Sequence, residues 1–297
     1  MFDFHIHTKY SGCCKEDYNV IDAYNKAEDR GYTGIGVSDH CNYKGYRAPG
    51  KFLIEQRKQI SLNGLTDKVK LGLEITILNR KGDLGVKPKY LEKLDYYIIS
   101  EHVHIAKLFS HFYRIKKKTK KRLKAGKKLD KIEKSIHEIA TMVVNGAMRN
   151  PNTINAHLWR FPRNVNFLST LVLEQTPRIL EALQNSRVAF ELHSGIVGML
   201  MLTDEESDQL HEKNLKEIHP DFHELLLPPK EFGAELLKMM KKYDLKYALG
   251  SDAHRLNQVG RIGKNNHADS VKKYLASIGI NEKELVTPEF FKVTLNS

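Results

Sequence analysis

Short apolar runs recur along the chain, and most of them are rich in β-branched or aromatic residues. Seven such runs occupy residues 2–4, 33–37, 69–73, 96–99, 153–156, 188–190 and 246–249. Runs of this length and composition are typical of β-strands. A His, Asp or Glu follows each run almost at once. The pattern therefore predicts seven strands, each ending in a residue type that binds metal ions.

Segments with apolar residues at helical spacing lie between these runs, at 20–30, 132–144, 167–183 and 232–243. The last of them follows Pro228-Pro229 and carries lysines in its final turn, which the helix dipole favours. Strand and helix alternate along the chain, which predicts an α/β fold whose parallel strands close into a barrel or form an open sheet. No linker rich in Pro, Gly or Ser interrupts residues 1–297, so we expect one domain, with a C-terminal helical cap from about residue 278.

The composition of the chain indicates the cellular compartment in which the protein is expected. The chain has 297 residues with 41% hydrophobic and 28% charged residues, which are the values of a globular protein. Its three cysteines are too few for a disulfide framework and fit a reducing cytoplasm. No apolar run approaches the ~18 residues of a membrane span, and the N-terminus lacks the pattern of a signal peptide. We therefore expect a cytoplasmic protein without a membrane partner.

The residues that follow the strands are the candidate site. The carboxyl ends of the strands in a (β/α) barrel meet at one mouth, so residues far apart in sequence come together there. A cluster of imidazoles and carboxylates is best stabilised by divalent cations such as Zn, Mn or Fe. The candidate ligands are His5, His7, His40, Glu74, His102, His157, Asp252 and His254.

These residues lie in six ordered motifs: His5-Ile6-His7-Thr8, Asp39-His40, Gly72-Leu73-Glu74, Ser100 with His102, Ala156-His157, and Gly250-Ser251-Asp252-Ala253-His254. Together they resemble the motifs of the PHP (polymerase and histidinol phosphatase) family, from residue 3 to about residue 263. The resemblance implies a distorted (β/α)7, TIM-like barrel, a site of two or three metal ions and phosphoesterase activity.

The resemblance also implies a division of the ligands. His5, His7, Glu74 and Asp252 would hold one ion, and Glu74 would bridge to a second ion held by His102 and His157. His40 and His254 would hold a third ion.

The chain departs from the family pattern at three positions. Cys13 occupies the place of the further His or Asp that usually completes the third site, so a thiolate would bind there or the site would be weak or empty. Leu158 replaces the usual proline, although the expected arginine is present as Arg160. His193 replaces an asparagine that often follows the glutamate of the sixth strand.

The expected chemistry follows from two neighbouring cations. A hydroxide shared between them would attack phosphorus, because each ion lowers the pKa of bound water. Arg160 and Arg255 are candidates to clamp the phosphate, since guanidinium binds it in bidentate fashion. The leaving alkoxide needs a proton or a metal ion, which His193 or a third ion would supply.

A local basic segment is the other notable feature. Lys and Arg exceed Asp and Glu by 48 to 36, and most of the +12 comes from residues 114–134. This segment is either a solvated insertion or a contact for a phosphate-rich partner such as a nucleic acid. It contains no aromatic residue that could stack on bases.

Four functions remain open on the sequence. The favoured one is a small-molecule phosphomonoesterase of the histidinol-phosphatase or sugar-phosphatase kind. The alternatives are a phosphodiesterase or exonuclease, a non-catalytic metal-binding module, and an amidohydrolase, which the Asp39-His40 and Asp252-Ala253-His254 pairs disfavour. The substrate, the metal and the oligomeric state stay open.

Overall fold

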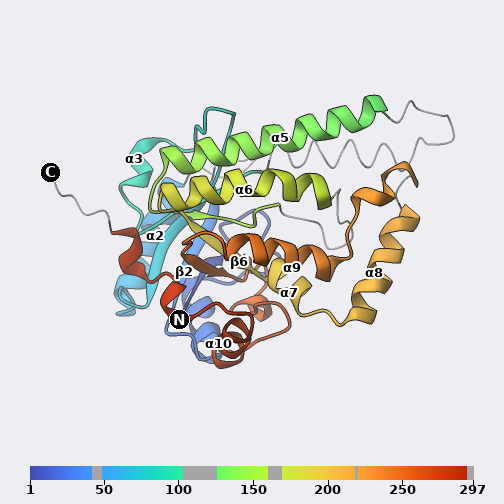
Figure 1. The fold of residues 1–297 in the computed structure, drawn as a ribbon. Coiled ribbons are helices and arrows are strands. Elements are labelled where there is room, and N and C mark those ends of the chain that lie inside the picture. The colour runs from blue at the N-terminus through green and yellow to red at the C-terminus, as the bar shows by residue number, and fades with distance from the viewer. Residues whose placement is uncertain (42–48, 103–125, 160–168, 218–219, 293–297) are drawn as a thin grey trace.

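Seven parallel strands follow one another around a single sheet in the order of the chain. The computed structural model describes residues 1–41, 49–102, 126–159, 169–217 and 220–292 (Figure 1). The strands are β1 (Phe2–Ile6), β2 (Gly34–Cys41), β3 (Val69–Thr76), β4 (Ile98–Ser100), β5 (Ile154–Asn155), β6 (Ala189–His193) and β7 (Tyr247–Gly250). Each coincides with one of the apolar runs, and several extend into the polar residues that follow.

The sheet curls until its first and last strands meet. The backbone N–H of His7 donates to the carbonyl of Ala253 at 3.0 Å, just beyond the ends of β1 and β7. The result is a nearly closed α/β barrel of the TIM type, and the predicted fold class is confirmed.

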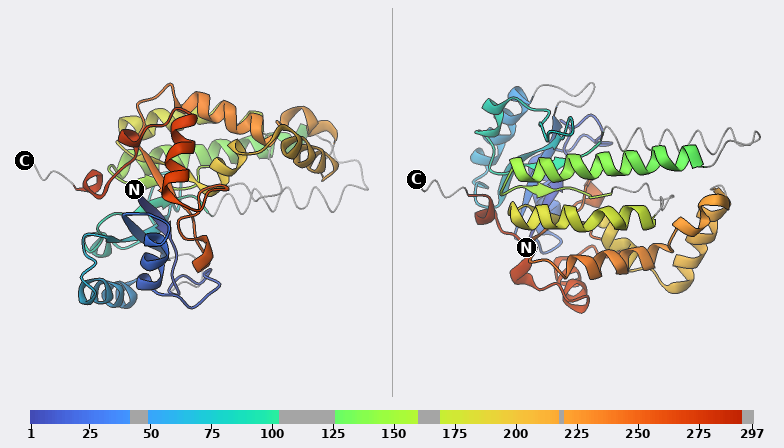
Figure 2. Two further views of the ribbon diagram at one scale, coloured as in Figure 1. Left: turned by 90° about the horizontal axis from the view of Figure 1, so that it is seen from below. Right: turned by 45° about the horizontal axis from the view of Figure 1, so that its top comes forward.

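Helices cover the outside of the barrel. They are α1 (Val20–Glu28), α2 (Gly50–Leu62), α3 (Pro88–Leu91), α5 (Gly126–Arg149), α6 (Ser169–Asn185), α7 (Ser194–Leu200), α8 (Asp204–Glu217), α9 (Pro229–Met240) and α10 (Ala268–Ser277). The long helices α5 and α6 lie side by side, with α9 next to α6, whereas α8 lies away from the sheet (Figures 1 and 2). None of the helices in these ranges is long and apolar enough to cross a bilayer.

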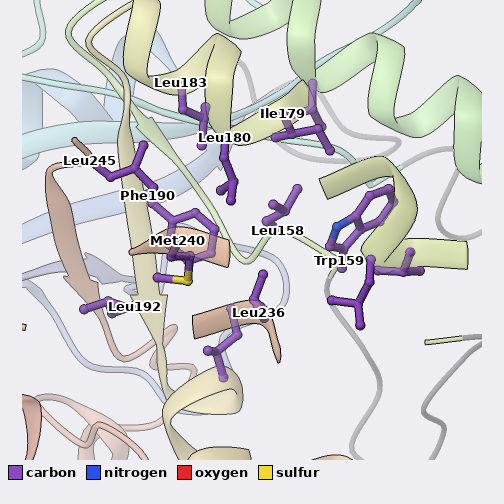
Figure 3. Packing of buried hydrophobic residues seen from close by; sticks show 14 of the residues in the cluster. Leu158, Trp159, Ile179, Leu180, Leu183, Phe190, Leu192, Leu236, Met240 and Leu245 are labelled. Atoms are coloured by element: carbon purple, nitrogen blue, oxygen red, sulfur yellow. The ribbon is translucent and has the colours of Figure 1, made fainter. Parts of the chain in front are cut away.

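The largest apolar cluster lies between the sheet and these helices (Figure 3). Phe190 of β6 packs there with Leu180 of α6 and Leu236 of α9. Trp159 is buried at the edge of this cluster, where its Nε1–H donates to Thr176 Oγ1 at 3.0 Å. This packing holds the strand ends in fixed positions.

A separate apolar cluster fills the barrel interior. The rings of Phe4, Tyr96 and Phe291 pack with centroids 5.2–5.4 Å apart. Tyr96 fits because Gly72 has no side chain; a Cβ there would lie 2.5 Å from the tyrosine ring. Phe291 belongs to the C-terminal segment, which forms two short 3-10 helices (Glu282–Glu284 and Pro288–Phe291). Two expectations stay predictions: that residues 1–297 form one domain, and that a helical cap begins at about residue 278.

Candidate metal centre

Glu74 lies at the centre of the cluster that the strand ends bring together. Its Oε1 lies 2.8 Å from His157 Nε2 and 3.1 Å from His102 Nε2. Its Oε2 lies 3.0 Å from His40 Nδ1, 3.3 Å from His5 Nε2 and 3.4 Å from His7 Nε2. One carboxylate of β3 therefore faces histidines that come from four other strand ends.

Asp252 completes the cluster from the loop after β7. Its Oδ1 lies 3.2 Å from His7 Nε2, 3.5 Å from His5 Nε2 and 3.6 Å from His254 Nδ1. The fold thus brings together all eight of the histidines and carboxylates that the strand-end pattern singles out. Their role as ligands stays a prediction.

The Nδ1 atoms of His5 and His7 already make hydrogen bonds outside the cluster. His5 Nδ1 lies 2.5 Å from Glu191 Oε1, a carboxylate to which only an N–H can donate. His7 Nδ1 lies 3.1 Å from Ser11 Oγ, whose own hydroxyl donates to Asp39 at 2.8 Å. Both rings therefore carry their proton on Nδ1, and both Nε2 lone pairs face the cluster.

His254 has the same arrangement. Its Nδ1 lies 2.8 Å from the carbonyl oxygen of Asp252, which can only accept a hydrogen bond. The proton is therefore on Nδ1 and the Nε2 lone pair is available. Fixing the tautomer through the far nitrogen in this way is the usual arrangement for histidines that bind metals.

Asp39 anchors the loop that carries Ser11. Its carboxylate accepts from the Thr8 N–H and hydroxyl at 2.7 Å each, and from Gln56 Nε2 of α2 at 2.7 Å. It also accepts from Ser11, which in turn holds His7. Asp39 and Thr8 appear in the family motifs without an assigned role, and the structure shows that they position a candidate ligand.

Glu191 contacts two of the candidate ligands and is not among the residues that the sequence analysis singles out. Besides its contact with His5, its Oε2 accepts from the backbone N–H of His157 at 2.5 Å. A Cβ on Gly250 would collide with this carboxylate, so the glycine makes room for it. The available signal was its position at the end of the sixth strand, where every other strand supplies a candidate ligand.

Burial and mutual charge set the protonation of the cluster. Burial alone would raise the pKa of Glu74, but the imidazoles of His40, His102 and His5 hold it well below its usual range. Burial would lower the pKa of His5, but Glu191 and Glu74 raise it well above the ordinary value. Burial and the charge of His40 lower the pKa of His7 instead. The carboxylates thus favour positive charge on His5, whereas burial and His40 disfavour it on His7.

The donor set fits divalent metal ions. Within the described ranges, Glu74 Oε2 is buried and accepts no hydrogen bond, although three ring nitrogens lie 3.0, 3.3 and 3.4 Å away. Several nitrogen atoms therefore gather around this one oxygen. Four overlapping triads have their ligand atoms within 4.8 Å of one another: His5, Glu74 and His157; His5, His7 and Asp252; His40, Glu74 and His102; and His7, Cys13 and His40. Imidazole with carboxylate is a set that suits Zn, Mn and Fe.

Two of the candidate ligands have strained backbones. Asp252 has φ 51° and His157 has φ 27°, in the left-handed region that side chains other than glycine seldom adopt. Each such residue costs roughly 1–3 kcal/mol, and such costs concentrate at functional sites. The fold therefore holds both side chains toward the cluster at a cost in stability.

Cys13 lies beside His40 and His254. Burial would raise the pKa of its thiol, but hydrogen bonds to His254 and His40 lower it to about 7. Cys13, Cys14 and Cys41 are all free thiols.

The remaining predicted residues are less central. His193 caps α7, with its Nδ1 accepting from the Gly195 N–H at 3.0 Å, and its ring centre lies 6.3 Å from that of His157. Arg255 is exposed just after His254. Arg160 and residues 114–125 of the basic segment lie outside the described residues, and residues 126–134 begin α5.

The fold of this chain is similar to folds among the solved structures. A crystal structure of histidinol phosphate phosphatase from Lactococcus lactis, complexed with zinc, L-histidinol and phosphate, matches 94% of this chain and 94% of its own chain. The TM-score is 0.56 and the sequence identity is 15%, so the similarity is one of fold. No family model and no curated protein matches the chain.

Proposed function

We propose that the protein is a metal-dependent phosphatase with a PHP-type centre. The observation that carries this proposal is the position of Glu74, whose two oxygens face separate groups of imidazoles. A carboxylate with His157 and His102 on one oxygen and His5, His7 and His40 on the other is suited to bridge two cations.

The ligands divide between two core ions. His5, His7, Glu74 and Asp252 would hold the first ion, and Glu74, His102 and His157 the second. Zn, Mn and Fe all fit this donor set. When bound, such ions supply Lewis-acid activation of water and offset the negative charge of a phosphate ester.

The chain itself supplies positioning and proton donation. The Nδ1 of His193 accepts from a backbone N–H, so the ring proton is on Nε2, which makes this nitrogen a donor. We assign it a proton donor's role toward the phosphate or the leaving group. Arg160 and Arg255 are proposed to orient the phosphate.

The favoured substrate class is a small phosphomonoester of the histidinol-phosphate type. The L. lactis structure of similar fold holds zinc, histidinol and phosphate, which supports this class for the present chain. A diester or nucleic-acid substrate is the alternative, and the basic segment at 114–134 is the feature that favours it.

The test is phosphate release from a panel of phosphorylated metabolites, with a generic aryl monoester and diester compared, after loading with Zn, Mn or Fe. We expect release from monoesters that chelation abolishes. His7→Ala and Asp252→Asn should each abolish turnover while circular dichroism remains that of the wild type. Asn is chosen because it tolerates the left-handed backbone of residue 252.

Three outcomes would reject the proposal. Full activity in either variant would remove these residues from the ligand set. Faster turnover of the diester would favour the nuclease alternative. Bound metal without turnover of any phosphate ester would leave a binding module.

A further inference from the structure

A cavity of about 240 Å³ lies at the end of the barrel opposite the candidate metal centre. Arg187 and Val188, just before β6, line it together with Leu245 and Lys246, just before β7. The parallel strands of a barrel all start at one end, and the candidate ligands follow the other ends of the strands. The cavity is therefore separate from the site already described.

Apolar side chains line part of this cavity. Leu183, Val188 and Leu245 are buried members of the large apolar cluster between the sheet and the helices. The half-buried ring of Phe290 adds an aromatic surface. Pockets for drug-sized ligands measure roughly 300–1,000 Å³, so this smaller cavity suits a metabolite with one apolar or aromatic group.

Two opposite charges line the same cavity. Arg187 and Asp244 are both exposed there. Within the part of the chain that the structure describes, no ion pair engages the guanidinium of Arg187 or the carboxylate of Asp244. Lys246 also lines the cavity, but its Nζ donates to the carbonyl of Lys283 at 3.4 Å. The cavity thus offers one unpaired cation and one unpaired anion beside an apolar surface.

Arg187 has a costly backbone conformation. Its φ of 52° lies in the left-handed region, at the turn between α6 and β6, where glycine or asparagine is usual after a helix. The Val188 N–H closes this turn by donating to the Leu183 carbonyl at 2.8 Å, and the Asp244 N–H donates to Gln184 Oε1 at 3.0 Å. Such backbone costs concentrate at functional sites, and the residue held here is a cation at the cavity.

We propose that this cavity binds a free α-amino acid with an apolar or aromatic side chain. Arg187 pairs with the carboxylate of the amino acid, because a guanidinium matches a carboxylate with two parallel hydrogen bonds. Asp244 accepts from its ammonium group, and its side chain packs against Leu183 and Phe290. A simple anion would satisfy Arg187 but would meet the negative charge of Asp244. The inference goes beyond the proposed function and uses no residue of the metal centre.

The experiment titrates the protein with L-phenylalanine in a calorimeter, and with phenethylamine and 3-phenylpropionate, which each lack one of the two charges. We expect L-phenylalanine to bind, and the Kd of each analogue to be about tenfold higher or more, the usual effect of losing a hydrogen bond to a charged group. Arg187→Asn and Asp244→Asn should each raise the Kd of L-phenylalanine by a similar factor. Asn is chosen at position 187 because it tolerates the left-handed backbone.

Two control variants locate the binding. Asp208→Asn makes the same change at an exposed position of α8, and His7→Ala alters the candidate metal centre. Both should bind L-phenylalanine as the wild type does. Loss of binding in His7→Ala would place the ligand at the metal centre and overturn the inference.

Three further results would also overturn it: no binding of L-phenylalanine by the wild type, an unchanged Kd in Arg187→Asn or Asp244→Asn, or equal affinity for 3-phenylpropionate. Each of these results leaves phosphate release untouched, so the proposed function stands or fails by its own test.

Discussion

A single buried carboxylate organises the candidate site. Glu74 is unpaired with any Lys or Arg among the described residues, and the groups around it are imidazoles from β1, β2 and the loops after β4 and β5. Imidazoles offer lone pairs and a carboxylate offers negative charge, so the combination suits divalent cations.

Glu191 provides a prediction at the residue scale. In Glu191→Gln the contact with His5 Nδ1 loses its charge, and the ring is less firmly held with Nε2 toward the cluster. We expect the affinity for zinc to fall about 10–100-fold, the usual effect of removing such an orienting partner. Competition with a chelating dye measures it.

The control for this prediction is Glu205→Gln, which changes an exposed carboxylate of α8. It should bind zinc as the wild type does. Equal affinity in both variants would mean that Glu191 does not act on the metal.

At the scale of elements, the loop between β1 and α1 is part of the site because Asp39 of β2 binds it. Four donors from Thr8, Ser11 and Gln56 converge on this one carboxylate. The loop in turn orients His7 and carries Cys13. Its order therefore depends on a strand and a helix that lie later in the chain.

Asp39→Ala should destabilise this unit. It leaves four buried donors without their acceptor, and each unsatisfied donor costs about 1–3 kcal/mol. We expect the free energy of unfolding to fall by about 3 kcal/mol or more, measured by urea denaturation of the metal-free protein. Asp67→Ala, at an exposed position after α2, is the control and should change little. A stability equal to that of the control would contradict the anchoring role.

At the scale of the whole molecule, residues near the two ends of the chain meet at the candidate site. β1 carries His5, and Asp252 and His254 follow β7, so ligands from the first ten and the last fifty residues would share ions. A ligand that binds only the folded state stabilises that state by mass action. Bound metal should therefore stabilise the contact between the first and last strands of the barrel.

Metal removal tests this at the level of the molecule. At a free zinc concentration of about 100 times the Kd, the stabilisation is about 2.7 kcal/mol, which corresponds to roughly 5 °C in Tm. We expect a chelator to lower the Tm by this amount and added zinc to restore it, as followed by calorimetry. Glu74→Gln should show no response to either addition. A wild-type Tm that is the same with and without the chelator would contradict metal binding in the folded state.

Much of the architecture followed from local pattern. Apolar runs such as 69–73 predicted the strands, because a strand buried in a barrel must be apolar over consecutive residues. Helices such as α2 and α10 were not anticipated. α10 begins after a short polar loop, and α2 has little contrast between its apolar and polar faces.

The sequence by itself determined the seven strands, their order and the residue types at their carboxyl ends, because these depend on short stretches of the chain. Tertiary structure alone decided which ring nitrogen of each histidine faces inward. His5 and the carboxylate that holds its proton are 186 residues apart, and Ser11 orients His7 only through Asp39 of the next strand. A tautomer is set by the partner on the far side of the ring, and that partner is known only when the strands have come together.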